Sequence, residues 1–153
     1  MFPTTTDRVP SQTDEQINRR IQEQIRRNVV HYSGCSAELI DLRLQELDEE
    51  WDVERALEFN AATLATSSVI LGLCGKKRWF LLAGVVTAFL AQHALQGWCP
   101  PLPLLRRLGV RTAYEIDRER YALKALRGDF QGLKLDGEAI GHEQVDAALA
   151  AVH

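Results

Sequence analysis

Three cysteines are the first residues in this sequence whose side chains could carry chemistry, because a thiolate can attack a disulfide or accept a sulfur atom. They are Cys35, Cys74 and Cys99. The sequence has no Cys-x-x-Cys pair and no cysteine at the spacing from histidine that is typical of a zinc site. Cys99 is the leading candidate thiol and Cys35 the second, because Arg106 and Arg107 follow Cys99 and positive charge favours a thiolate.

His93 is the other candidate for chemistry, and Gln92 and Gln96 lie near it in an apolar segment. A lone histidine in such a segment more often hydrogen-bonds to a neighbouring helix than ligates haem or a metal. The acidic run 46–58 has no histidine partner and no metal-ligand spacing. Since no glycine-rich phosphate loop or G-x-S-x-G motif is present either, we predict a protein without enzyme activity, cofactor or metal.

These candidates lie in or near a stretch of unusual composition, residues 59–105, whose only charges are Lys76, Lys77 and Arg78. A helix rises about 1.5 Å per residue, so about 20 apolar residues cross the hydrocarbon core of a bilayer. Segment 79–98 meets this requirement, whereas 59–75 is shorter and carries several hydroxyl side chains. We predict two membrane-spanning helices joined by a tight turn at 75–78, which makes the lipid bilayer a partner of this chain.

Two further features of the apolar stretch favour a helical hairpin in lipid. Trp79 and Trp98 bracket the second span, and indole rings favour the two membrane interfaces. Small residues also recur at four-residue spacing, which lets helix backbones approach closely in a bilayer. The predicted helix-packing residues are Ser68, Gly72, Gly84 and Ala88.

Residues 13–58 are predicted to form an acidic, helical N-terminal arm, preceded by a disordered tail over 1–12. A first helix is expected over 14–32, with Thr13 as its cap and a narrow apolar stripe. That stripe consists of Ile17, Ile21, Ile25 and Val29. Helices 14–32 and 37–58 together suit docking to a partner protein, and the basic face of the first also suits a membrane surface.

The second helix of the arm is expected to begin near residue 37, after the break at 33–36. Its apolar positions follow the 4-3-4 spacing of a helix packed on another helix. Those positions are Ile40, Leu44, Leu47 and Trp51. Because no glycine or proline occurs between residues 36 and 71, we expect this helix to continue into the first span as one rod.

The hairpin and its proline stop cover 59–105, and residues 106–153 are predicted to form a helix followed by a flexible tail. The prolines at 100, 101 and 103 must end the second span. A helix is expected from 113 to about 127, and a weak one at 142–152. The start of the chain has no apolar core, so we expect no signal peptide.

A hairpin places both termini on one side of the membrane. Lysine and arginine favour the cytoplasmic side. The flanks of the two spans carry six such residues and the turn carries three. This favours cytoplasmic termini only weakly, because the turn is densely basic. The formal net charge of -3 also argues against a nucleic-acid partner.

The end of the second span resembles the YgaP-like family of inner-membrane proteins over about residues 60–112. That family has a two-span hairpin whose second helix ends in a Gly-aromatic-Cys-Pro motif, followed by a leucine pair, Leu-Gly and Thr. The matching residues here are Gly97, Trp98, Cys99, Pro100, Leu104, Leu105, Leu108, Gly109 and Thr112. The resemblance implies a bacterial inner-membrane protein with cytoplasmic termini, a possible homodimer and a link to sulfur handling.

In some members of that family the hairpin follows a rhodanese-type sulfurtransferase domain. The acidic helical arm in this sequence does not resemble one, and no glycine-rich persulfide loop follows Cys35. We therefore do not expect sulfurtransferase activity.

The sequence thus predicts an all-α fold and a non-enzymatic integral membrane protein, acting as a homo-oligomer or as an accessory or scaffold subunit. Two alternatives stay open. One is a thiol or sulfur relay that uses Cys99 with Cys35, and the other is a soluble all-helical oligomer with residues 59–98 buried between chains.

Overall fold

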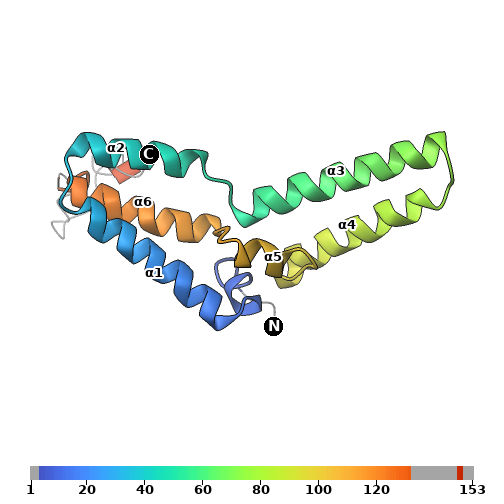
Figure 1. Ribbon diagram of the computed structural model, residues 1–153, viewed down its shortest axis with the longest axis horizontal. Coiled ribbons are helices and arrows are strands. Elements are labelled where there is room, and N and C mark those ends of the chain that lie inside the picture. The colour runs from blue at the N-terminus through green and yellow to red at the C-terminus, as the bar shows by residue number, and fades with distance from the viewer. Residues whose placement is uncertain (1–3, 132–147, 150–153) are drawn as a thin grey trace, which may run out of the picture. The chain divides into compact units, whose positions relative to one another are not determined.

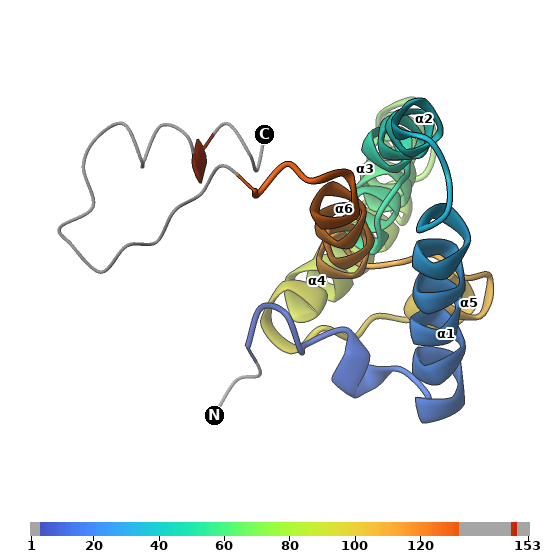
Figure 2. The same cartoon turned by 90° about the vertical axis from the view of Figure 1, so that its left-hand side faces the viewer.

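The computed structural model describes residues 4–131 and 148–149, and within them the chain is helical with no strand (Figure 1 and Figure 2). This confirms the all-α prediction. A short 3-10 turn, η1, covers Pro10–Gln12. The α-helices are α1 (Glu15–Tyr32), α2 (Ala37–Glu49), α3 (Val53–Cys74), α4 (Trp79–Gln96), α5 (Leu102–Arg107) and α6 (Ala113–Arg127).

The described residues form two compact units, each with its own core. The first contains residues 4–22 and 51–114, and the second contains residues 23–50 and 115–131. We describe each unit by itself.

In the first unit, α3 and α4 pack side by side and are joined by residues 75–78 (Figure 1). Helix α5 contacts α3. The core of this unit contains residues from the start of α3, from the segment after α4 and from the N-terminal segment. Its buried members are Val9, Val53, Leu57, Cys99 and Leu102, with Leu105 and Val110 packed against them.

The expectation of a disordered tail over 1–12 is wrong for residues 4–12. Val9 is 1% exposed in the core of the first unit, and Arg8 forms an ion pair with Glu54 at 3.2 Å. Hydrogen bonds within the segment hold it in turns, among them the bond from the Ser11 N–H to the Asp7 carbonyl at 2.9 Å. A segment that is fixed by one apolar side chain and one ion pair has no periodic pattern, so its sequence resembles that of a free tail.

The expectation of one rod through residue 51 is also wrong. Helix α2 ends at Glu49, and α3 begins at Val53. Asp52 adopts an extended conformation and its Oδ1 accepts the Arg55 N–H at 2.6 Å, which is the geometry of a helix N-cap. An aspartate cap can begin a new helix without a glycine or proline, and for that reason our search for helix breakers missed it.

The cap of α1 differs from the expectation in a similar way. The Gln16 N–H donates to Asp14 Oδ1 at 2.8 Å, so Asp14 takes the capping role that was assigned to Thr13. The Thr13 hydroxyl instead donates to the Val9 carbonyl at 2.8 Å. Thr13 therefore fastens the preceding segment, and the extent of the helix itself is close to the predicted 14–32.

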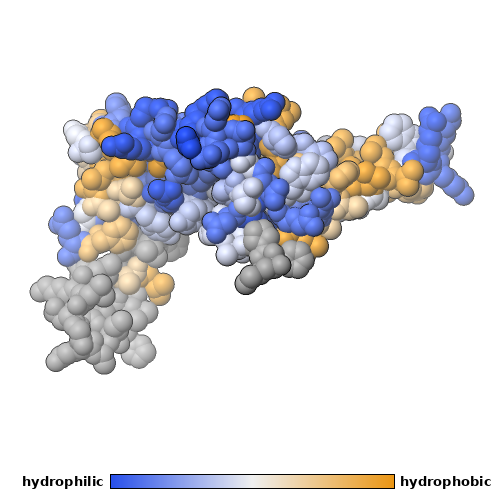
Figure 3. All heavy atoms as spheres, turned by 90° about the horizontal axis from the view of Figure 1, so that it is seen from below, coloured by the Kyte–Doolittle hydropathy of each residue, from blue (hydrophilic) through white to orange (hydrophobic). Residues whose placement is uncertain are grey.

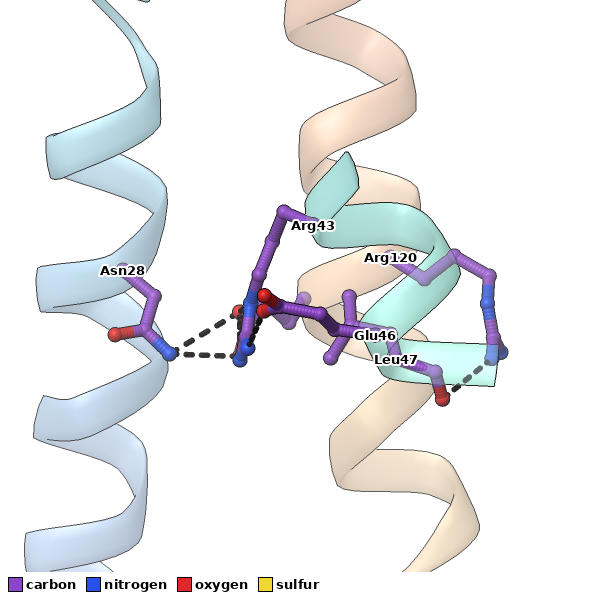
Figure 4. A network of polar contacts seen from close by, with 6 residues as sticks. Asn28, Arg43, Glu46, Leu47 and Arg120 are labelled. Carbon is purple, nitrogen blue, oxygen red and sulfur yellow. Dashed lines mark hydrogen bonds and ion pairs between the residues drawn. The ribbon is translucent and has the colours of Figure 1, made fainter. Parts of the chain in front are cut away.

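The second unit combines an apolar core with a buried network of charged groups (Figure 4). Ile40, Leu44 and Leu47 of α2 are buried against α6, as their spacing predicts, whereas Trp51 is 44% exposed. The core consists of Ile40, Leu44, Leu47, Ile116 and Leu123, with Tyr32 packed against it.

Glu119 lies at the centre of the charged network and is fully buried. Arg43 pairs with it at 2.9 Å, and the Asn28 side-chain amide donates to it at 3.1 Å. Arg43 also pairs with the exposed Glu46 at 2.8 Å, and Arg120 donates to the Leu47 carbonyl at 3.3 Å. Helices α1, α2 and α6 are thus joined through side chains that a search for apolar stripes ignores.

The C-terminal predictions divide at residue 131. Helix α6 covers Ala113–Arg127 and is followed by Gly128 with φ of 96°, which confirms the expected helix over 113–127. The predicted weak helix at 142–152 and most of the predicted flexible tail lie outside the described residues.

Candidate functional site

The candidate functional site is the exposed apolar surface of α3 and α4. The large hydrophobic side chains of these helices point mostly away from the protein. Figure 3 shows this hydrophobic surface, with hydrophilic atoms at the end where residues 75–78 lie. The exposed side chains are Phe59, Leu64, Val69, Ile70, Leu71, Leu73, Phe80, Leu81, Leu82, Val85, Phe89 and Leu95.

Two stretches of the chain are long and apolar enough to cross a membrane, one ending at Cys74 and the other being Trp79–Gln96. Only 17% of the most apolar 18 residues in the first, and 11% in the second, are buried within the protein. The core helix of a soluble protein would be mostly buried. These helices instead present apolar side chains outward, which is the arrangement that suits lipid.

The lengths of the two helices also match a bilayer. The 18 residues of α4 extend for about 27 Å and the 22 residues of α3 for about 33 Å, close to the thickness of about 30 Å of a hydrocarbon core. Lys76, Lys77 and Arg78 are exposed in the connection between them, where lipid headgroups would meet them. Trp79 and Trp98 are half-buried at the two ends of α4.

The four predicted helix-packing residues divide into two that face α4 from α3 and two that do not lie in that contact. Ser68 is 2% exposed, and its hydroxyl donates to the Leu64 carbonyl at 2.6 Å. A methyl group added at Gly72 would lie 2.9 Å from the Phe80 ring, so this glycine lets the two helices approach. By contrast, Gly84 and Ala88 are exposed. Four-residue spacing defines a stripe on each helix, but it does not say which stripe meets the neighbour.

The Gly-aromatic-Cys-Pro motif, residues 97–100, forms a tight turn after α4. Gly97 has φ of 75° and ends α4, three residues before the first proline, by donating its N–H to the His93 carbonyl at 2.7 Å. A side chain at Gly97 would collide with the Arg8 carbonyl, which lies 2.2 Å from the position of a Cβ. This turn brings Cys99 into the core of the first unit.

The remaining motif residues occupy mixed environments. Pro100, Leu104 and Leu108 are exposed, while Leu105 packs against the core and Thr112 is buried. Gly109 has φ of 89° just after α5, where a non-glycine residue would be strained. The motif therefore shapes the chain between α4 and α6 and does not present a reactive group.

Cys99 is 4% exposed, and burial raises the pKa of its thiol above the ordinary value. The expectation that the neighbouring arginines favour a Cys99 thiolate is wrong. Arg106 is itself buried, and it donates to the Thr13 hydroxyl at 3.2 Å and to Asn18 Oδ1 at 3.0 Å. Its charge is engaged by these oxygens, and the thiol is enclosed by apolar side chains.

The other two cysteines lie in different surroundings. All three are free thiols. Cys35 is half-buried in the second unit, where its thiol donates to the His31 carbonyl at 3.4 Å, and Cys74 is exposed at the end of α3. Cys99 belongs to the first unit and Cys35 to the second.

Burial predicts the order in which the two candidate thiols react. In a Cys74→Ser background we expect a maleimide at neutral pH to modify Cys35 at least about tenfold faster than Cys99, because Cys99 needs local opening before it reacts. Mass spectrometry of peptides at timed quenches measures the two rates, and unfolding the protein in denaturant should abolish the difference. Equal rates in the folded protein would contradict the enclosed position of Cys99 and favour a relay role for it.

The first unit also contains a group of polar residues of which the sequence indicated only His93 as a candidate. His93 is 4% exposed, and Glu54 of α3 and Arg8 of the N-terminal segment are the charged groups that act on it. Arg8 pairs with Glu54 and donates to the Ala94 carbonyl at 3.1 Å. We refer to Arg8, Glu54 and His93 as the polar cluster. Neither Arg8 nor Glu54 carried any signal in the sequence, because Arg8 lies in a segment without a periodic pattern and Glu54 lies in an acidic run.

Among the described residues no group of three or more histidine, cysteine or acidic side chains could hold a metal ion. Scans against protein-family models, curated proteins and solved structures give no match to this chain.

Proposed function

We propose that this chain is a small, non-enzymatic integral membrane protein whose α3 and α4 form a transmembrane helical hairpin. In this proposal it acts as a homo-oligomer or as an accessory or scaffold subunit of a membrane assembly. The observation that carries the proposal is the outward-facing apolar surface of these two helices, of which only a small part is buried within the protein. In water such an apolar surface would promote aggregation, whereas in a bilayer it contacts the lipid chains and anchors the protein.

Exposed residues on α4 and on the second unit support an interaction role. Gly84 and Ala88 form a small-residue stripe on α4 that a neighbouring transmembrane helix fits, since small residues allow close backbone approach in lipid. Val30 of α1 and Leu39 and Leu42 of α2 are exposed apolar side chains on the second unit. They favour docking of a partner protein or a second copy on the N-terminal helices.

We further propose a bacterial inner-membrane location with cytoplasmic termini. The support is the similarity of the segment after α4 to the YgaP-like hairpin and the count of basic residues in the flanks of the spans. The thiol or sulfur relay is a weaker candidate, because burial raises the pKa of the Cys99 thiol and encloses it.

The anchor is tested by placing a charge on its outer surface. Val85 is 44% exposed near the middle of α4, so Val85→Arg would be harmless if this surface met water. In lipid, arginine at the centre of a span costs about 2.5–3.5 kcal/mol, and we expect the variant to lose most of its membrane insertion. Recovery in the pellet after carbonate extraction, compared with the wild-type protein, measures the effect.

Leu108→Arg is the matched control, because Leu108 is 72% exposed and lies outside both spans. It should remain in the carbonate pellet like the wild-type protein. Recovery of the wild-type protein as a soluble oligomer without detergent would overturn the proposal and support the alternative in which residues 59–98 are buried between chains. Insertion of Val85→Arg at wild-type levels would likewise count against a lipid-facing position for Val85.

A further inference from the structure

The polar cluster of Arg8, Glu54 and His93 leaves four buried polar atoms without a hydrogen-bond partner among the described residues. They are Arg8 Nε, Glu54 Oε2, and both ring nitrogens of His93. Buried polar atoms are almost always paired, so a group of orphaned atoms at one place points to a ligand or to a change of state. The three residues come from the N-terminal segment, α3 and α4 of the same unit.

The geometry divides the Glu54 carboxylate into two halves. Its Oε1 accepts Arg8 Nη2 at 3.2 Å, while its Oε2 is buried and unpaired. Arg8 in turn donates through Nη1 to the Ala94 carbonyl at 3.1 Å, one residue beyond His93 on α4. Arg8 thus fastens the N-terminal segment to both α3 and α4. A positive charge on the His93 imidazole would act on Arg8 and Glu54, the two residues that make this attachment.

The charges of the cluster balance only while His93 is neutral. Arg8 contributes one positive charge and Glu54 one negative charge, on side chains that are 21% and 29% exposed, so a proton on His93 adds an unbalanced positive charge at a ring that is 4% exposed. Burying an unbalanced charge is costly, and the imidazolium would also compete with Arg8 for the Glu54 carboxylate. The position of His93 in the last turn of α4 favours a cation, but this effect is small beside the burial of the ring.

We propose that Arg8, Glu54 and His93 form a proton-binding site that releases the N-terminal segment from the helix pair when His93 is protonated. A proton on the buried and unpaired ring of His93 favours the released form, so docking is complete above the ordinary pKa of histidine, about 6.5, and is lost as the pH falls below it. Release would carry Val9 out of the core of the first unit and uncover Cys99, which packs in the same core.

Hydrogen exchange of the N-terminal segment in the full-length protein, held in detergent micelles, tests the inference. The N–H groups of Arg8, Ser11 and Gln12 are bonded within the docked segment, to the carbonyls of Thr4, Asp7 and Val9 respectively. After correction for intrinsic exchange rates, their protection should fall about tenfold or more between about pH 7.5 and about pH 5.5. Constant protection over this range would overturn the proposal.

Two substitutions give the test its specificity. His93→Gln keeps a polar side chain that cannot be protonated, so protection should change less than about twofold over the same range. His31→Gln is the matched control, because His31 is exposed on α1, and it should keep the pH response of the wild-type protein. A pH response in His93→Gln equal to that of the wild-type protein would show that another group binds the proton.

Arg8→Gln provides a second test that does not need His93→Gln to fold. Without the positive charge of Arg8, the cluster is balanced only when His93 is protonated and faces Glu54. Protection in this variant should therefore be lower than in the wild-type protein at about pH 7.5 and should rise towards pH 5.5, which reverses the sign of the response. The same direction of response as in the wild-type protein would contradict the charge balance on which the proposal depends.

Discussion

Replacing Gly97 with alanine is expected to lower the free energy of unfolding of the first unit by about 2–5 kcal/mol. A left-handed conformation costs a non-glycine residue about 1–2 kcal/mol, and Gly97 has φ of 75°. The new methyl group would also lie 2.2 Å from the Arg8 carbonyl oxygen. The backbone of the N-terminal segment would therefore have to move, at a further cost of about 1–3 kcal/mol. Thermal unfolding in detergent micelles measures the loss.

Gly84→Ala is the matched control for this prediction. Gly84 lies inside α4, and apart from its chain neighbours and the adjacent backbone of its own helix no atom lies within 4 Å of the position that a Cβ would take. Alanine there should leave stability unchanged or raise it by up to about 1 kcal/mol, since glycine is a poor helix former. If the two variants unfolded alike, Gly97 would not be in close contact with the N-terminal segment.

Replacing Glu119 with leucine is expected to destabilise the second unit by about 3–5 kcal/mol. Glu119 is fully buried, and removing its carboxylate leaves Arg43 and the Asn28 amide without their shared acceptor. Breaking a buried ion pair by removing one partner is costly, because Arg43 keeps its pair with the exposed Glu46 but loses the buried carboxylate that offsets its desolvation. Urea-dependent hydrogen exchange of α6 amides measures the free energy of opening of this unit.

Glu46→Leu is the control for Glu119→Leu, because Glu46 pairs with the same arginine at 2.8 Å but its side chain is 63% exposed. An exposed pair contributes about 0–1 kcal/mol, so this variant should unfold close to the wild-type protein. A loss of similar size in both variants would mean that the pairing of Arg43, and not the burial of Glu119, sets the stability of the network.

Helix positions in this protein follow mainly from local sequence. The apolar stripe at helical spacing placed α1, the turn at Gly109 with the capping pair Thr112 and Glu115 placed α6, and the charge-free stretch bounded by 76–78 and the prolines located α4. These features depend on neighbouring residues, because helix formation and termination are decided over one or two turns of chain. The break at 50–52 escaped us because an aspartate cap gives a weaker signal than glycine or proline.

The sequence predicted which stretch of the chain forms the candidate site, but not which of its side chains are exposed. The apolar stretch and its length could be counted, and they led to the membrane hypothesis. The sequence did not say which residues of each helix face outward, so Ser68 and Gly72 could not be separated from Gly84 and Ala88. Nor did it show that Cys99 is enclosed, because the segment that covers it includes Val9, which is 90 residues earlier in the chain.

By itself, the sequence determined an all-helical chain with a charge-free stretch long enough to cross a bilayer. Only the tertiary structure decided which residues meet, as Arg8 meets Glu54 and the Ala94 carbonyl, and as Arg43 meets Glu119. The physical reason is that helix propensity and hydropathy are properties of consecutive residues. The pairing of buried charges and the burial of a thiol depend on side chains that folding brings together from distant parts of the chain.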